Sequence, residues 1–248
     1  MILVEQSAYG NRWRKAAPVA KAAFSLLGMA AAFLAASPEA ACAVALVLAV
    51  AACGGAGIPP GRYLRVAGPS LLFLLAGGAS LAVSLSWRSG FPWVDFHLGQ
   101  GQMLQAAQVC GRSLACLAAL LFLTLTTPLV DILGLLRRCG LPAVLLDLMS
   151  LCYRTLFVFS DAAQDMVTAQ AARLGYASPR HSLRSLGGLI GNLTVQILYR
   201  SQALHRAALA RNHEGPLLFL RDGNPSSRAH LILALLGGAG LLFLARML

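Results

Sequence analysis

The sequence contains few charged residues, and this scarcity excludes most classes of soluble protein. Only 12% of the 248 residues are charged, whereas 58% are hydrophobic, and the mean hydropathy is +0.69. A soluble domain of this length does not bury so much apolar surface, so we expect an integral membrane protein. The net charge of +11 is then first an orientation signal, because basic residues collect in cytoplasmic loops. Nucleic acid is not an expected partner.

Motifs for nucleotide hydrolysis and for metal binding are also missing. There is no GxxxxGK[ST] phosphate loop, and the two lysines, Lys15 and Lys21, lie near the first apolar segment. Six cysteines are scattered through apolar segments without a CxxC pair, which is typical of small core residues rather than of a metal site. We expect no catalytic residues, no metal ligands and no cofactor. Any ATP is therefore expected to be hydrolysed by a partner.

Five apolar segments are long enough to cross a bilayer, and they predict an all-α, polytopic membrane protein. The fourth contains Arg112, whose charge is costly in lipid and should therefore face protein or reach the outer interface. The first ends at Ala36-Ser37, which resembles a signal-peptide cleavage region, but the further spans favour an uncleaved helix. The expected spans are residues 19–36, 40–56, 66–86, 103–127 and 229–246.

A polar and basic region separates the fourth span from the last. It opens with a short amphipathic pattern at 129–139. The apolar stretch 143–160 could span a bilayer, but we expect it to lie beneath or partly within the bundle and to continue into the polar region. The chain is thus divided into transmembrane helices at 1–127, a cytoplasmic region at 128–228 and a C-terminal transmembrane helix at 229–248. We expect the protein to lie in the inner membrane with its N-terminus in the cytoplasm. In this orientation the basic residues fall on the cytoplasmic side, with three exceptions: Arg88, Arg112 and Arg246.

The stretch from Asp161 to Gly215 is predicted to form a structured arm of two amphipathic helices. The first ends before Ser178-Pro179, and the second begins near Leu183 with Ser182 as its cap. Apolar residues recur every three or four positions along the second helix, which predicts a face that needs a partner helix. They are Leu183, Leu186, Ile190, Leu193, Ile197, Leu204 and Ala208.

Both arm helices are predicted to end in an Ala-Arg pair. Ala172-Arg173-Leu174 is followed by Gly175, and Ala210-Arg211-Asn212 is followed at a short distance by Gly215. A single arginine there is explained by the attraction between a cation and a helix C-terminus, worth about 0.3–1 kcal/mol at an exposed site. The same pair at two helix ends of one basic arm instead favours contact with a soluble partner through two fixed guanidinium groups.

Short motifs spread over nearly the whole chain carry a family resemblance. They are Asn11-Arg12-Trp13-Arg14-Lys15 with Pro18 and Lys21, Leu125-Thr126-Thr127-Pro128, Leu135 to Pro142, Tyr153-Arg154, Ala172 to Tyr176, and Ala210-Arg211-Asn212. In this order they resemble the transmembrane T component of energy-coupling factor (ECF) transporters, and within these the cobalt-type CbiQ family. Nickel-type relatives are similar.

This resemblance implies a non-catalytic membrane scaffold that couples two ABC ATPase subunits to a separate substrate-binding membrane protein, within membrane lipid. The arm helices would be coupling helices whose ends, Ala172-Arg173-Leu174 and Ala210-Arg211-Asn212, contact the ATPases. Leu174 and Asn212 stand where the family usually has glycine. Transport of nickel or another micronutrient is an alternative. So is a stand-alone metal permease or membrane enzyme, which would need ligands or acid–base groups inside the membrane.

Overall fold

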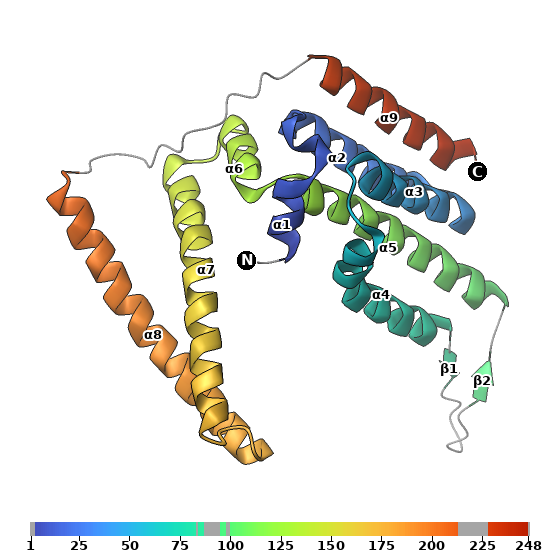
Figure 1. The fold of residues 1–248 in the computed structure, drawn as a ribbon. Coiled ribbons are helices and arrows are strands. Elements are labelled where there is room, and N and C mark those ends of the chain that lie inside the picture. The colour runs from blue at the N-terminus through green and yellow to red at the C-terminus, as the bar shows by residue number, and fades with distance from the viewer. Residues whose placement is uncertain (1–2, 83, 87–94, 98–99, 213–227, 248) are drawn as a thin grey trace. The chain divides into compact units, whose positions relative to one another are not determined.

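The computed structural model describes residues 3–82, 84–86, 95–97, 100–212 and 228–247, almost all of them helical (Figure 1). They belong to two compact units, residues 1–135 with 222–248 and residues 136–221. The high helical content confirms the all-α class. The first unit contains α1 (Leu3–Gly10), η1 (Arg12–Lys15), α2 (Pro18–Leu34), α3 (Pro38–Val50), a π-helical turn η2 (Ala51–Gly55), α4 (Pro60–Ala82), α5 (Gln100–Thr126) and α9 (Arg228–Met247).

The remaining elements are a small ladder and the helices of the second unit. Strands β1 (Ser84–Ser86) and β2 (Asp95–His97) pair antiparallel, with Ser84 opposite His97. The sequence reasoning did not predict them. Helix α6 (Leu129–Arg138) begins in the first unit and ends in the second. It is followed by α7 (Ala143–Ala172) and α8 (Pro179–Ala210).

Two helices begin with the same Ser-Pro signal. Ser37 accepts a hydrogen bond from the Ala40 N–H and Pro38 opens α3, while Ser178 accepts from the His181 N–H and Pro179 opens α8. The prediction that Ser182 caps a helix starting near Leu183 was therefore wrong. Proline ends the preceding helix, but it also suits the first helical position, where an N–H has no intrahelical partner.

Within the described residues, five helical stretches are long and apolar enough to cross a membrane. Four correspond to predicted spans, although α4 starts at Pro60 rather than 66. The predicted first span is α2, whose 17 residues lie at the short end of the range of about 17–25 that crosses a bilayer. Helix α7 is the fifth stretch, by length and composition. The multi-pass membrane class is confirmed, while the sidedness of the termini stays a prediction.

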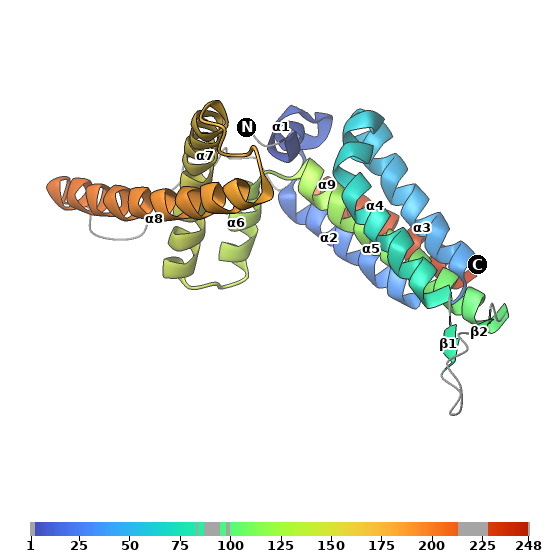
Figure 2. The ribbon, with the colours of Figure 1, turned by 90° about the horizontal axis from the view of Figure 1, so that it is seen from below.

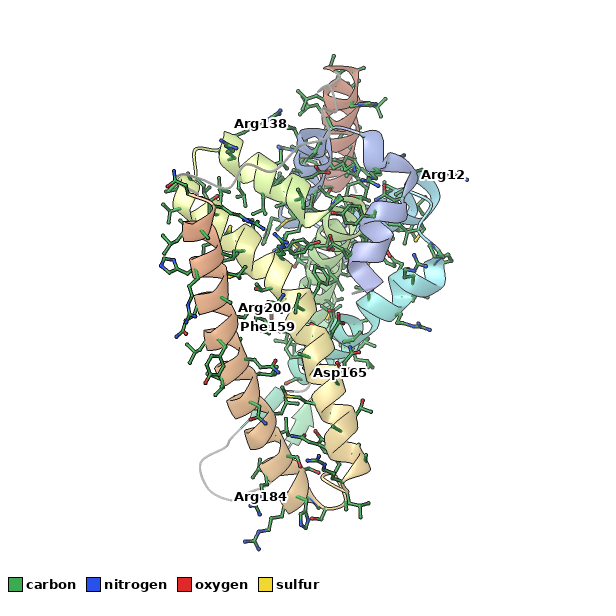
Figure 3. All side chains as sticks on the ribbon, turned by 60° about the vertical axis from the view of Figure 1, so that its left-hand side comes forward. Arg12, Arg138, Phe159, Asp165, Arg184 and Arg200 are labelled. Carbon is green, nitrogen blue, oxygen red and sulfur yellow. The ribbon has the colours of Figure 1, made fainter. Side chains whose placement is uncertain are left out.

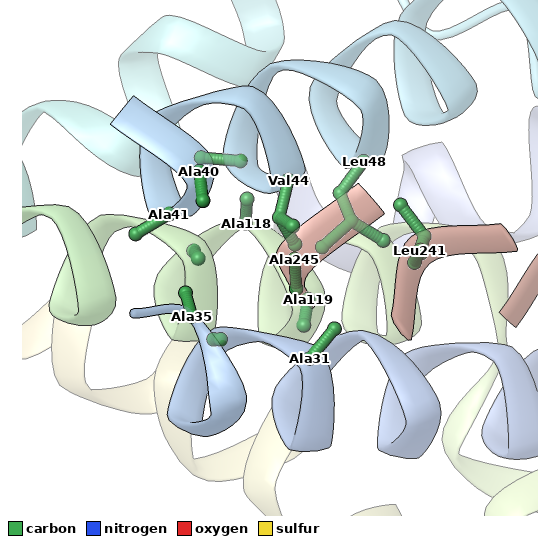
Figure 4. Packing of buried hydrophobic residues seen from close by; sticks show 13 residues of the cluster. Ala31, Ala35, Ala40, Ala41, Val44, Leu48, Ala118, Ala119, Leu241 and Ala245 are labelled. Atoms are coloured by element: carbon green, nitrogen blue, oxygen red, sulfur yellow. The ribbon is translucent and has the colours of Figure 1, made fainter. Parts of the chain in front are cut away.

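One of the two buried clusters of the first unit is built mainly from small residues (Figure 4). A β-carbon on Gly28 would lie 3.1 Å from the Leu48 side chain, and one on Gly111 would lie 3.2 Å from the Ala41 β-carbon. Such small residues let membrane helices approach closely. The prediction that the cysteines are core residues was wrong, since three are exposed and three are only partly buried. Alanine and glycine fill the closest helix contacts instead. This small-residue cluster comprises Ala31, Ala32, Ala35, Ala40, Ala41, Val44, Ala45, Leu48, Ala115, Ala118, Ala119, Leu241 and Ala245. The other cluster contains Leu121, Phe122 and Leu125 of α5.

Helices α2 and α5 run antiparallel, and each supplies a cation to the end of the other (Figure 2). Lys21 Nζ donates to the Thr126 carbonyl at 2.9 Å, and Arg112 Nη2 donates to the Ala35 carbonyl at 3.0 Å. The last carbonyls of a helix lack intrahelical donors, so a cation there is favourable. The expectation that Arg112 faces protein is confirmed.

Candidate functional site

The first predicted site residue, Arg173, ends α7 in a well-defined turn. Ala172 is the last helical residue, and Arg173 follows with φ −96° and ψ 18°. Leu174 has φ 59°, in the left-handed region. The Leu174 N–H donates to the Ala171 carbonyl at 3.0 Å, and the Gly175 N–H donates to the Gln170 carbonyl at 2.9 Å. This pair of bonds is a Schellman motif, which satisfies carbonyls at the helix end.

The second predicted site residue, Arg211, ends α8 in the same way. Ala210 is the last helical residue, Arg211 has φ −98° and ψ 8°, and Asn212 has φ 47°. The Asn212 N–H donates to the Leu209 carbonyl at 3.0 Å, which matches the bond made by Leu174. Gly215, which the sequence also singled out, lies outside the described residues. The two Ala-Arg ends thus share one backbone conformation as far as both are described.

Hydrogen bonds fix the corner where α7 meets α8. Gln170 Nε2 donates to the Ser185 carbonyl at 3.1 Å, Ser185 Oγ donates to the Gly175 carbonyl at 2.9 Å, and Tyr176 Oη donates to Gln170 Oε1 at 2.8 Å. A β-carbon on Gly175 would lie 2.7 Å from Ser185 Oγ, so only glycine fits there without a shift. Sequence reasoning missed Gln170 and Ser185, because single polar residues at half-buried helical positions carry no distinctive pattern. These hydrogen bonds connect the Arg173 end of α7 to the first turns of α8.

The structure does not bring the two arginines together. Helices α7 and α8 meet at the corner and diverge from it in both views (Figures 1 and 2). Arg173 lies at the corner and Arg211 at the far end of α8, whose 32 residues give it a length of about 48 Å. Both arginines are exposed. The arrangement therefore offers two separate contact points rather than one site.

The apolar face predicted along α8 has no partner helix along most of its length in the described part of the chain. Leu183, Ile190 and Ile197 are exposed, because α8 diverges from α7 beyond the corner. Arginines lie along the same helix, with Arg184 near the corner and Arg200 farther along (Figure 3). The face is thus open to another protein or to lipid.

Buried hydrogen bonds connect two of the motifs that carry the family resemblance. Asn11 Nδ2 donates to the carbonyls of Thr126 and Ala8, both at 2.9 Å, and Lys21 Nζ also donates to Thr126. Asn11 and Lys21 are both buried. The N-terminal segment is therefore fastened to the end of α5, next to the Thr127-Pro128 connection that leads into α6.

No three histidine, cysteine, aspartate or glutamate side chains within the described ranges lie close enough to hold a metal ion. Thiol and imidazole groups are instead dispersed. His181 Nδ1, for example, forms a 2.7 Å hydrogen bond with Ser178 Oγ at the start of α8. The chemistry available at the two Ala-Arg ends is recognition by guanidinium groups, which bind carboxylates and backbone carbonyls directionally.

Comparison with known proteins assigns a family. The model of the CbiQ family, described as cobalt transport protein, matches residues 10–219. A cobalt transport protein CbiQ of Rhodobacter capsulatus is 36% identical over 166 residues, which are 67% of this chain and 66% of that one. The corresponding protein of Salmonella typhimurium is 29% identical over 81% of this chain and 92% of its own.

An uncharacterized protein of Methanocaldococcus jannaschii is 32% identical over 126 residues, covering 50% of this chain. The chain thus spans 47% of the length of this archaeal relative and 66% of that of the Rhodobacter relative. The family match itself extends from η1 through α8 and includes both Ala-Arg ends. The chain belongs to the CbiQ family of cobalt transport proteins.

Proposed function

We propose that this protein is the non-enzymatic membrane subunit that couples ATP hydrolysis by partner subunits to cobalt uptake. The chain's own sequence has no phosphate-binding loop, so ATP is hydrolysed by two ABC ATPase subunits. Cobalt is captured by a separate substrate-binding membrane protein. The bundle anchors the complex in the cell membrane, with the N-terminus and the arm on the cytoplasmic side.

The observation that carries this proposal is the equivalence of the two Ala-Arg ends. Arg173 and Arg211 have nearly the same backbone angles, and the residue after each makes the same hydrogen bond to the end of its helix, yet the two arginines are separated by the length of α8. Two like contact points at a distance of about 48 Å suit two copies of one kind of soluble partner. The contacting residues are Ala172, Arg173 and Leu174 at one end and Ala210, Arg211 and Asn212 at the other.

The substrate-binding subunit docks on the apolar face of α8. Leu183, Ile190 and Ile197 supply exposed apolar surface along this helix, and burial of such surface stabilises association. A rigid corner at Gly175 would transmit movement of an ATPase at Arg173 to α8 and to whatever covers its apolar face. Closure of the ATPases would in this way alter the substrate-binding subunit without chemistry in this chain.

Charge reversal at the two ends tests the proposal. We expect the native chain to recover its genomically adjacent ATPase on detergent co-purification, and an Arg173→Glu, Arg211→Glu double variant to lose it. Removal of one partner from a buried charged contact costs roughly 3–5 kcal/mol. Each single variant keeps one contact and should recover about half as much ATPase.

An Arg65→Glu, Arg200→Glu variant is the matched control, because both arginines are exposed and neither lies at the α7–α8 corner or at the C-terminal end of α8. It carries the same change in charge and should recover the ATPase normally. Equal recovery by all variants would refute the role of Arg173 and Arg211. Uptake of radiolabelled cobalt and nickel by cells that express the whole complex then decides between cobalt and its nickel alternative.

A further inference from the structure

Leu174 occupies a backbone conformation that disfavours leucine. Its φ of 59° lies in the left-handed region, where a β-carbon approaches the following carbonyl oxygen. Glycine adopts this conformation without penalty, and asparagine is tolerated because its short polar side chain bonds locally. Asn212, at the matching position of α8, has φ 47°. Leucine is therefore the more strained choice of the two.

The chain itself shows that glycine closes the same motif. The turn that follows α6 contains Gly140 at φ 84°, and the Gly140 N–H donates to the Arg137 carbonyl at 3.3 Å. The Leu141 N–H then donates to the Leu136 carbonyl, also at 3.3 Å. These are the two bonds made at the end of α7 by Leu174 and Gly175. Backbone closure by itself thus gives no reason for a leucine at 174.

Packing within the protein gives no reason either. The Leu174 side chain is 75% exposed, and it follows an exposed arginine. Backbone strain that neither closure nor packing explains tends to occur at functional sites, where a partner uses the strained residue. The exposed leucine is a natural apolar anchor beside a guanidinium group.

We propose that Leu174 is an apolar anchor that enters the ATPase together with Arg173, so that the two docking ends are unequal. This inference rests on the proposed function. The ATPase surface that receives the α7 end then has an apolar wall beside the group that binds Arg173. The surface at the α8 end meets Asn212 and needs no such wall. Leu174 thereby decides which docking end holds an ATPase more tightly.

The test compares three variants of Leu174. For Leu174→Gly, folding stability and ATPase affinity should change in opposite directions. Leu174→Gly relieves the strain and should raise the melting temperature of the detergent-solubilised chain. It should also weaken binding of the purified adjacent ATPase by about tenfold, the loss expected when a leucine is no longer buried in an apolar groove. Leu174→Ala, which keeps the β-carbon, should weaken binding similarly, whereas Leu174→Met should bind normally.

Leu64→Ala, at an exposed leucine of α4 outside both docking ends, is the control and should bind with native affinity. Unchanged or tighter ATPase binding by both Leu174→Gly and Leu174→Ala would overturn the anchor. Binding that falls for Leu174→Gly alone would also overturn it, since the cause would then be added backbone freedom. If Arg173→Glu weakens binding while the Leu174 variants do not, the anchor fails and the proposed function stands. If Arg173→Glu has no effect either, both fail.

Discussion

At the end of α5, two side-chain nitrogens donate hydrogen bonds to a backbone carbonyl that has no donor within the helix. Asn11 and Lys21 both donate to the Thr126 carbonyl, and Asn11 also lies 3.4 Å from the Leu125 carbonyl. Lys21 is only 4% exposed, so its ammonium group relies on this contact rather than on bulk water. The position of Thr126 therefore depends on residues more than a hundred positions earlier in the chain.

This double contact predicts non-additive effects of substitution. Lys21→Met and Asn11→Ala should each cost about 1 kcal/mol, because Thr126 keeps one donor in either variant. The double variant leaves the carbonyl without a donor and should lose more than the sum. Thermal unfolding in detergent measures this, at about 2–4 °C for each kcal/mol in a chain of this size. Arg65→Met, at an exposed position, is the control, and strictly additive losses would contradict the shared contact.

At the scale of elements, the α7–α8 corner determines how the two arm helices are held. Its bonds link Gln170, Gly175 and Ser185, and beyond them the helices separate. Two helices that are connected at one end and separate along the rest can transmit a movement of that end along the arm. A defect in the corner should therefore disturb the whole arm rather than one residue.

Alanine substitution at two glycines distinguishes the contribution of the corner to stability from the general stabilising effect of alanine in a helix. A β-carbon on Gly175 meets Ser185 Oγ at 2.7 Å and the Gln170 carbonyl oxygen at 2.9 Å, so Gly175→Ala should destabilise the protein by about 1–3 kcal/mol. A β-carbon on Gly187 has nothing within 4 Å, and Gly187→Ala should raise stability by up to about 1 kcal/mol because alanine favours helix. Melting temperatures measured in the same detergent give the comparison. A Gly175→Ala variant as stable as the native chain would show that the corner relaxes freely.

Local signals predicted much of this element structure. The lengths of the apolar runs predicted five spans, and four of these correspond to long apolar helices in the structure. The Ala-Arg pairs at the ends of the two arm helices were also visible in the sequence. Ser178-Pro179 was visible too, but its proline was read as a helix breaker and not also as the first residue of α8. The left-handed turn at Leu174 could not be predicted from the residue, since leucine disfavours it. Contacts such as Lys21 with Thr126 depend on tertiary packing and leave no local pattern.

At the scale of the whole molecule, the distribution of charge predicts which side of the membrane the arm occupies. The arm carries Arg173, Arg180, Arg184, Arg200, Arg206 and Arg211, whereas the turn between α2 and α3 contains no basic residue. Basic segments stay cytoplasmic. The arm and the α2–α3 turn should therefore lie on opposite sides.

Labelling of single cysteines tests this sidedness. In a variant without the six native cysteines, Ser201→Cys on α8 should react with a membrane-impermeant maleimide only in inside-out vesicles. Ala36→Cys, in the α2–α3 turn, should react in spheroplasts. Both positions are exposed in the structure, so accessibility within the protein does not limit the reaction. The reverse pattern would place the arm outside and remove the basis for contact with cytoplasmic ATPases.

The packing of α9 on α2 has a consequence for biosynthesis. Gly237 and Gly238 of α9 lie against Phe24 and Leu27 of α2, so the first long apolar helix to leave the ribosome rests against the last. Between them the whole arm must be translated. Elongation at about 5–20 residues per second needs roughly 10–40 s for residues 35–227, which separate α2 from α9. During that interval the flank of α2 faces lipid or the insertion machinery, and we expect nascent chains halted within the arm to be the form most readily degraded.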